Sequence, residues 1–238
     1  MEQRSTRYGQ LTAHLQGQPN GEGPIVALLH GFGAPGTDLV PLGDHLDVPG
    51  ATFVFFEAPL TMPPPFDAGR AWWMIDVTRF QTAVLSNELH ELERQEPEGL
   101  TAAASLLNEA LDAMQADLGP SRPLVLGGFS QGSMLALDHA LSGPRPLSGL
   151  VLWSSTLIAR DRWTDQMRFR AQLPCFQSHG TEDPVLPFVQ AQKLRSLLED
   201  HGLDVTWRTF QGGHGIPPSV VSEASAFMRK CTAGPGPE

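Results

Sequence analysis

The chain has 238 residues, of which 41% are hydrophobic and 18% charged, an ordinary globular composition with enough apolar material for a sizeable core. A formal net charge of -10, with no run of lysine and arginine, disfavours nucleic acid and anionic membranes as partners. No N-terminal signal-peptide pattern and no window near the roughly 18 apolar residues of a membrane span occur, so we expect a cytoplasmic protein without stable membrane insertion.

Short apolar runs alternate with longer helical patterns along the chain. The runs lie at 25–29, 52–56, 124–126, 150–153, 173–177 and 205–210. They are continuous, which favours a parallel sheet that is covered on both faces. Apolar residues at helical spacing occur around 107–118, 134–141, 189–198 and 220–227. The alternation predicts an α/β fold with a doubly wound, mostly parallel sheet and helices on both faces. We expect a single domain over residues 1–238.

One segment, at about 59–97, breaks this rhythm. It contains a run of three prolines and two adjacent tryptophans. We interpret it as an excursion over one edge of the sheet, near the functional loops, and not as a second domain. At the other end of the chain, residues 232–238 are rich in glycine and proline and are expected to form a frayed tail.

A serine motif follows the run at 124–126. Gly128-Phe129-Ser130-Gln131-Gly132 fits the pattern G-x-S-x-G, with a predicted strand before it and a predicted helix after it. This spacing suits a tight strand-to-helix turn, because glycines two positions away let the strand and the helix approach without Cβ clashes. The helix also directs its free N–H groups at the serine, where negative charge develops. We therefore predict that Ser130 is a catalytic nucleophile.

A serine hydroxyl needs a neighbouring base to take its proton. His214 lies in a glycine-rich loop directly after the run at 205–210, and we predict that it is this base. The other downstream candidate, His201, lies at the end of a predicted helix beside Gly202. An interaction with the helix dipole is the better interpretation for His201.

The acid that orients the base is expected between the serine and the histidine, after a strand. Asp183 follows the run at 173–177 and is the predicted acid, with Glu182 as the alternative. The acid would hold the imidazole in the correct tautomer and stabilise the imidazolium without taking the proton. Because Asp183 precedes a proline, a plain turn is the competing interpretation.

Two backbone N–H groups are predicted to stabilise the oxyanion. One belongs to Gln131, the residue after the nucleophile, and the other comes from the loop after an earlier strand. His30-Gly31-Phe32-Gly33 is that loop, with Phe32 as the donor. We interpret His30 as a structural residue that supports the loop.

Together these motifs resemble the phospholipase/carboxylesterase family of α/β-hydrolases, which includes the acyl-protein thioesterases. The resemblance lies in His30-Gly31-Phe32-Gly33, the Phe-Ser-Gln-Gly turn at Ser130, His179-Gly180-Thr181-Glu182-Asp183 and Gly213-His214. Arg70-Ala71-Trp72-Trp73 also resembles the Arg-Ala-Trp segment near the family's acyl site. The resemblance implies an α/β-hydrolase fold, the triad Ser130, Asp183 and His214, and oxyanion donors at Phe32 and Gln131. The excursion is too short for a large cap domain.

The chain departs from the thioesterase members at two places. It has Ala34-Pro35 where those members usually carry an aspartate, and Gly215-Ile216 after the histidine, where they usually carry a polar residue. We therefore expect a carboxylesterase that hydrolyses small acyl esters through an acyl-enzyme intermediate. An acyl thioesterase or lysophospholipase-type activity is the alternative, because one triad serves both chemistries. A catalytically silent binding protein is disfavoured, since all three triad roles are filled.

Apolar residues on or beside loops predict the substrate-binding wall. They are Trp72, Trp73, Met74, Phe80, Leu186 and Ile216. Core packing beneath the excursion is the competing interpretation for the tryptophans. No histidines show metal-ligand spacing and no glycine-rich nucleotide motif occurs, so we expect neither a metal nor another cofactor. The expected partner is a small-molecule acyl ester, and the sequence leaves a homodimer open.

Overall fold

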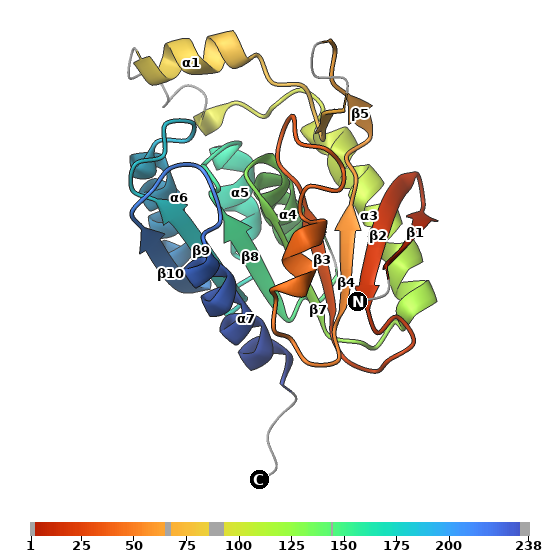
Figure 1. The fold of residues 1–238 in the computed structure, drawn as a ribbon. Coiled ribbons are helices and arrows are strands. Elements are labelled where there is room, and N and C mark those ends of the chain that lie inside the picture. The colour runs from red at the N-terminus through yellow and green to blue at the C-terminus, as the bar shows by residue number, and fades with distance from the viewer. Residues whose placement is uncertain (1–2, 65–67, 86–92, 144, 234–238) are drawn as a thin grey trace.

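A computed structural model describes residues 3–64, 68–85, 93–143 and 145–233. An eight-stranded sheet forms its centre, in the order β1-β2-β4-β3-β7-β8-β9-β10 (Figure 1). Six of these strands are parallel to one another: β3 (Ile25–Leu29), β4 (Thr52–Phe56), β7 (Leu124–Phe129), β8 (Gly149–Trp153), β9 (Pro174–Gly180) and β10 (Asp204–Phe210). Each matches an apolar run, so the predicted mostly parallel α/β sheet is confirmed.

The sheet edge nearest the N-terminus is antiparallel and was not predicted. Strand β1 (Gln3–Tyr8) pairs with β2 (Leu11–Gly17), and β2 pairs antiparallel with β4. Strand β1 is mostly polar and exposed, and β2 alternates apolar with polar residue types, so neither strand is the continuous apolar run that marks the parallel strands.

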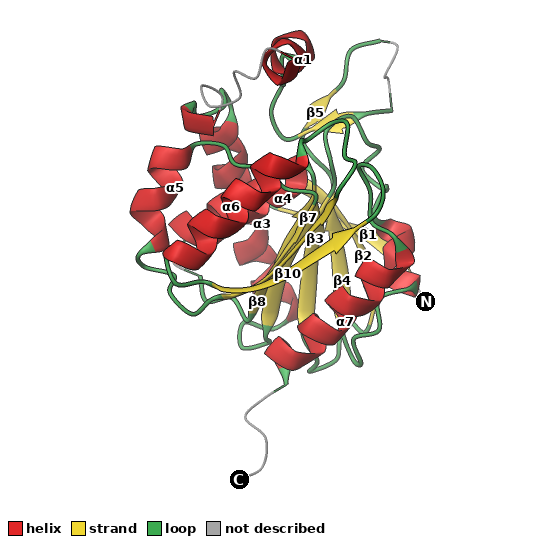
Figure 2. Cartoon of the chain, turned by 90° about the vertical axis from the view of Figure 1, so that its left-hand side faces the viewer, coloured by secondary structure: helices red, strands yellow, loops and turns green. Residues whose placement is uncertain are grey.

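Helices cover both faces of the sheet, as predicted (Figure 2). One core cluster joins the sheet to α3 (Leu100–Leu118), α4 (Gln131–Ser142), α5 (Arg160–Met167) and α6 (Phe188–Asp200). The cluster on the other face includes η1 (Val40–Asp44) and α7 (Pro218–Thr232). Helix α5 was not predicted, because its sequence is mostly polar and carries little apolar periodicity. No helix among the described residues is long and apolar enough to cross a membrane.

The excursion lies at the end of the sheet where the parallel strands finish (Figure 1). It forms a two-stranded sheet of β5 (Leu60–Thr61) and β6 (Arg70–Ala71), followed by α1 (Val77–Leu85). It therefore approaches the loops that carry the predicted catalytic residues. At the C-terminus, α7 includes Thr232, and the remainder of the predicted tail from residue 234 lies outside the described residues.

Candidate active site

Ser130 lies on a strained turn between β7 and α4. Its backbone has φ 53° and ψ -120°, a conformation that non-glycine residues rarely adopt. A Cβ atom on Gly132 would collide with the carbonyl oxygen of Leu29, and one on Gly128 would lie 2.6 Å from that same oxygen. Both glycines of the motif are therefore required for α4 to begin this close to β3.

Asp183 bonds to His214, the residue predicted as the base. His214 Nδ1 lies 2.7 Å from Asp183 Oδ2. The second oxygen, Oδ1, accepts the backbone N–H groups of Val185 and Leu186 at 2.8 and 2.9 Å. The loop after β9 thus fixes the carboxylate from one side, while the imidazole bonds to it from the other.

The electrostatics of Asp183 favour the ionised form, although its side chain is fully buried. Burial by itself would raise the pKa of Asp183. Bonds from His179, His214 and the backbone of Leu186 outweigh the burial and hold the pKa of this carboxyl well below its usual range. A carboxylate that stays ionised near neutral pH is what a histidine base needs as its orienting partner.

The two alternative candidates lie elsewhere. Glu182 is exposed and accepts a bond from Gln211 at 3.3 Å. His201 follows α6, and its Nδ1 lies 2.8 Å from the carbonyl oxygen of Leu197. The placement of His201 agrees with its interpretation as a partner of the helix C-terminus.

The His214 loop is fixed next to the serine turn. The ring of His214 lies 4.8 Å, centroid to centroid, from the ring of Phe129, the residue before Ser130. Ser154, which is fully buried, donates to the carbonyl oxygen of Gly215 at 3.3 Å. Ser130 and His214 line the same cavity. Sequence reasoning missed Ser154, and no motif in the sequence marks it.

The loop predicted to hold the second oxyanion donor follows β3 and reaches the same cavity, which Phe32 and Gln131 both line. Two backbone bonds join this loop to the excursion: Gly33 N–H to the Arg70 carbonyl at 2.8 Å, and Arg70 N–H to the Ala34 carbonyl at 2.9 Å. The excursion therefore fixes the loop that presents Phe32.

His30 supports this loop from below. Its Nε2 accepts the N–H of Ala58 at 3.0 Å, so the proton lies on Nδ1, which donates to the Gly31 carbonyl at 2.8 Å. Burial lowers the pKa of His30, which favours the neutral ring. These bonds are consistent with a structural residue.

The side chain of Gln131 has a role that sequence reasoning missed. Its Oε1 accepts the N–H of Trp72 at 3.0 Å, and its Nε2 donates to the carbonyl of Trp73 at 2.7 Å. The amide is fully buried. Gln131 therefore joins the serine turn to the excursion through two bonds.

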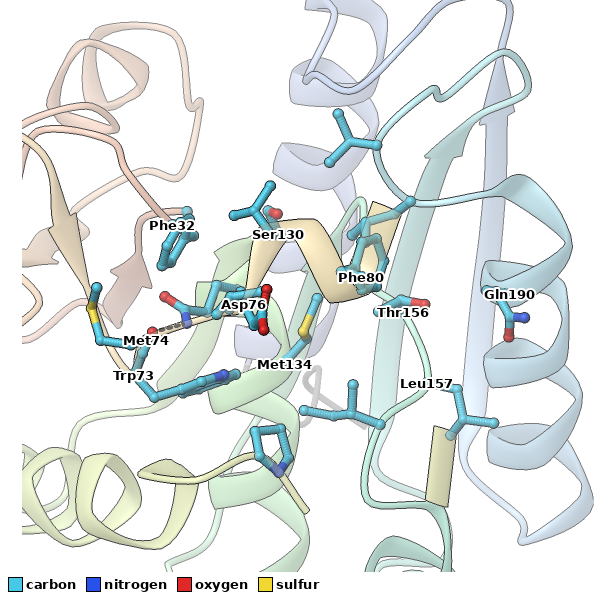
Figure 3. Close-up of a pocket in the computed structure, with 18 of the residues that line it drawn as sticks. Phe32, Trp73, Met74, Asp76, Phe80, Ser130, Met134, Thr156, Leu157 and Gln190 are labelled. Carbon is cyan, nitrogen blue, oxygen red and sulfur yellow. Dashed lines mark hydrogen bonds between the residues drawn. The ribbon is translucent and has the colours of Figure 1, made fainter. Parts of the chain in front are cut away.

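A cavity of about 690 Å³ extends from Ser130 beneath the excursion (Figure 3). Four of the residues that the sequence analysis assigned to a substrate wall line this cavity: Trp73, Met74, Phe80 and Leu186. Apolar lining residues that sequence reasoning did not include in the wall are Met134 and Leu157. Met134 could have been found, because it lies one helical turn after Ser130.

Two residues predicted for the wall are not among those that line the cavity. Trp72 is buried in the core, and its ring N–H donates to the His30 carbonyl at 2.9 Å. Ile216 packs against the core cluster on the α7 side of the sheet. Among the described residues, no group of three or more histidine, cysteine and acidic side chains could hold a metal ion.

The fold and the sequence motifs define a hydrolase of the α/β-hydrolase superfamily, and comparisons with known proteins give its family. The profile described as Phospholipase/Carboxylesterase matches residues 16–232. The chain therefore belongs to the phospholipase/carboxylesterase family, whose members are serine hydrolases.

Named relatives and solved structures agree with this family. Acyl-protein thioesterase 1 of Gibberella zeae is 31% identical over 157 residues, which cover 63% of this chain and 66% of that protein. Acyl-protein thioesterase 1 of Eremothecium gossypii is 30% identical over 213 residues, 85% of each chain. The crystal structure of esterase PE8 superposes with a TM-score of 0.75 at 25% identity, covering 97% of this chain and all of that one (100%).

Proposed function

We propose that this protein is a carboxylesterase that hydrolyses small acyl esters through Ser130, His214 and Asp183. The observation that carries the proposal is the bond between Asp183 and Nδ1 of His214, at the edge of a cavity that Ser130 also lines. An Nδ1–H that donates to a carboxylate leaves Nε2 as the basic nitrogen. The same ring can then take a proton from the serine and later return it.

The proposed reaction has two halves. In the first, Nε2 of His214 takes the proton of Ser130 Oγ as this oxygen attacks the ester carbonyl carbon, and the N–H groups of Gln131 and Phe32 bond to the oxyanion. Collapse of the tetrahedral intermediate breaks the carbon–oxygen bond to the alcohol, which leaves with the proton from His214. In the second half a water molecule loses a proton to His214 as its oxygen attacks the acyl carbon. Collapse of this second intermediate breaks the bond between the acyl carbon and Ser130 Oγ, which takes the proton back from His214 as the acid leaves.

The decisive experiment combines turnover with covalent labelling. p-Nitrophenyl esters from acetate to longer chains should be hydrolysed by the wild type, and Ser130→Ala should lose roughly 10³-fold or more of kcat. A fluorophosphonate probe should label the wild type but not Ser130→Ala. Ser142 is an exposed serine at the end of α4, the helix that follows Ser130. Ser142→Ala is therefore the matched control and should retain both turnover and labelling. Full turnover or labelling of Ser130→Ala would refute the proposal.

A second candidate is an acyl thioesterase, which the names of the relatives favour. The same attack would then expel a thiol in place of an alcohol. We favour the oxygen ester because Ala34, which lines the cavity, stands where thioesterase members usually carry an aspartate. Matched octanoyl oxygen esters and thioesters separate the two candidates. A kcat/KM at least about tenfold higher for the thioester would reverse the preference.

A further inference from the structure

One polar group lies in the lining of the cavity without a partner. Among the described residues that line the cavity, only Gln190 has a buried side-chain polar atom, Oε1, without a hydrogen-bond partner. Gln190 lies in the first part of α6 and is 5% exposed. Buried acceptors are nearly always paired in folded proteins, so an unpaired one beside a ligand cavity indicates that the ligand itself supplies the donor.

Gln190 is separated from the nucleophile by a largely apolar part of the cavity. Figure 3 shows Ser130 on one side of the view and Gln190 on the other, with Phe80 and Thr156 between them. Met134 and Leu157 also line the cavity. An acyl group attached to Ser130 would therefore pass apolar side chains before it reaches the amide. Because the last torsion of a glutamine side chain is broad, rotation of the amide would turn Oε1 toward a donor in the cavity.

A second acceptor lies near the same part of α6. Glu93 also lines the cavity, and its side chain is 5% exposed. Its Oε1 accepts from Lys193 at 2.5 Å, and Lys193 lies one helical turn after Gln190. Its Oε2 has a long contact of 3.9 Å with Arg160. This end of the cavity therefore offers oxygen acceptors, with the charge of Glu93 already balanced by Lys193.

We propose that Gln190, with Glu93, forms a distal subsite that binds a hydrogen-bond donor on the acyl group, so that the preferred substrates are hydroxyalkanoyl esters. This inference rests on the function proposed above. A plain alkyl chain that enters this region gives the Gln190 oxygen no partner, whereas a chain with a distal hydroxyl pairs it. A site that is built for a polar group discriminates strongly against analogues that lack the group.

The test uses p-nitrophenyl esters matched in chain length, at four, six and eight carbons. Each length is supplied as the plain alkanoate, the ω-hydroxyalkanoate and the ω-methoxyalkanoate, which accepts hydrogen bonds but cannot donate them. At one of these lengths, kcat/KM of the wild type should favour the hydroxyl compound over both others by at least about fivefold. Equal values, or a preference for the methoxy compound, would overturn the inference.

Variants locate the effect. In Gln190→Leu the ratio of the hydroxyl to the plain ester should fall to about one. In Gln192→Leu, an exposed glutamine two positions along the same helix, the ratio should remain as in the wild type. If the ratio in Gln190→Leu equals that of the wild type, the distal subsite is refuted. If Gln190→Leu does not fold, the wild-type preference among the three esters decides whether the subsite exists. Hydrolysis without a preference refutes this inference alone, whereas the absence of Ser130-dependent hydrolysis of every ester refutes the proposed function as well.

Discussion

The Nε2 atom of His179 lies 3.2 Å from Oδ2 of Asp183, the same oxygen that bonds to His214. The carboxylate is thus held between two imidazoles, both of which lower its pKa. His179 is fully buried and its Nε2 also donates to the carbonyl of Leu186 at 2.8 Å. We regard His179 as a positioning residue for Asp183.

This relationship predicts how the protein responds to acid. The pKa of Asp183 is lower in the folded state than in the unfolded chain, where it is about 3.9. The resulting stability is fully present above the unfolded pKa and is lost as the pH falls through the folded pKa. His179→Leu removes one of the donors, so its acid-unfolding midpoint, followed by circular dichroism, should move to higher pH than that of the wild type. Coincident midpoints would show that His179 does not stabilise the ionised Asp183.

The two bonds of the Gln131 side chain predict a loss of both stability and substrate discrimination. Gln131→Met keeps the length of the side chain but leaves the N–H of Trp72 and the carbonyl of Trp73 without partners. The free energy of unfolding from urea titration should fall by about 2 kcal/mol or more. The dependence of kcat/KM on acyl length should also flatten, because Trp73 lines the cavity. Gln192→Met is the exposed control, and an equal loss in both variants would contradict the assignment.

The close approach of α4 to β3 at Ser130 predicts which glycines tolerate a larger residue. Gly132→Ala places a methyl group against the carbonyl oxygens of Leu29 and His30, which are backbone atoms that cannot move aside. We expect a loss of about 3 kcal/mol or more in unfolding free energy, or no folded protein at all. A Cβ on Gly215 meets nothing within 4 Å, so Gly215→Ala should change the unfolding free energy by less than about 0.5 kcal/mol. Similar stabilities for the two variants would exclude the close approach of α4 to β3 at this turn.

A buried histidine away from the site gives stability a second pH dependence. Burial, followed by repulsion from Arg145 and Arg170, lowers the pKa of His139 to about 4. The unfolded chain binds this proton near pH 6.5, so stability is full above that pH and falls between pH 6.5 and about 4. In His139→Leu the difference in unfolding free energy between pH 7 and pH 5 should be smaller than in the wild type. The same substitution at exposed His45 should leave the difference unchanged, and equal effects would contradict the assignment.

Much of the fold could be predicted because its central strands are continuous apolar runs. The runs at 25–29 and 52–56 coincide with β3 and β4 residue for residue. The hairpin of β1 and β2 was missed because neither strand is a continuous apolar run. Its signal is the alternation at Leu11, Ala13 and Leu15, each buried, with less apolar residues between them.

Some residues of the candidate site could be predicted from local motifs, and others could not. Motif spacing predicted Ser130 and Asp183, whose surroundings are set by short local turns. It could not tell which of the adjacent residues Trp72 and Trp73 faces the cavity, because that depends on tertiary contacts with His30 and Gln131. Gln190 lacked any sequence signal, since a glutamine on an amphipathic helix is ordinarily a solvated residue.

The Gln131 amide couples two properties that protein engineers usually wish to vary separately. Its backbone belongs to the turn that follows Ser130, while its side chain bonds to the backbone of Trp72 and Trp73, of which Trp73 lines the cavity. Replacements that widen or narrow the cavity by shifting Trp72 and Trp73 will therefore also displace the turn at Ser130. Directed evolution toward bulkier esters should consequently recover catalytic speed through paired changes on both sides of this amide, and seldom through either change alone.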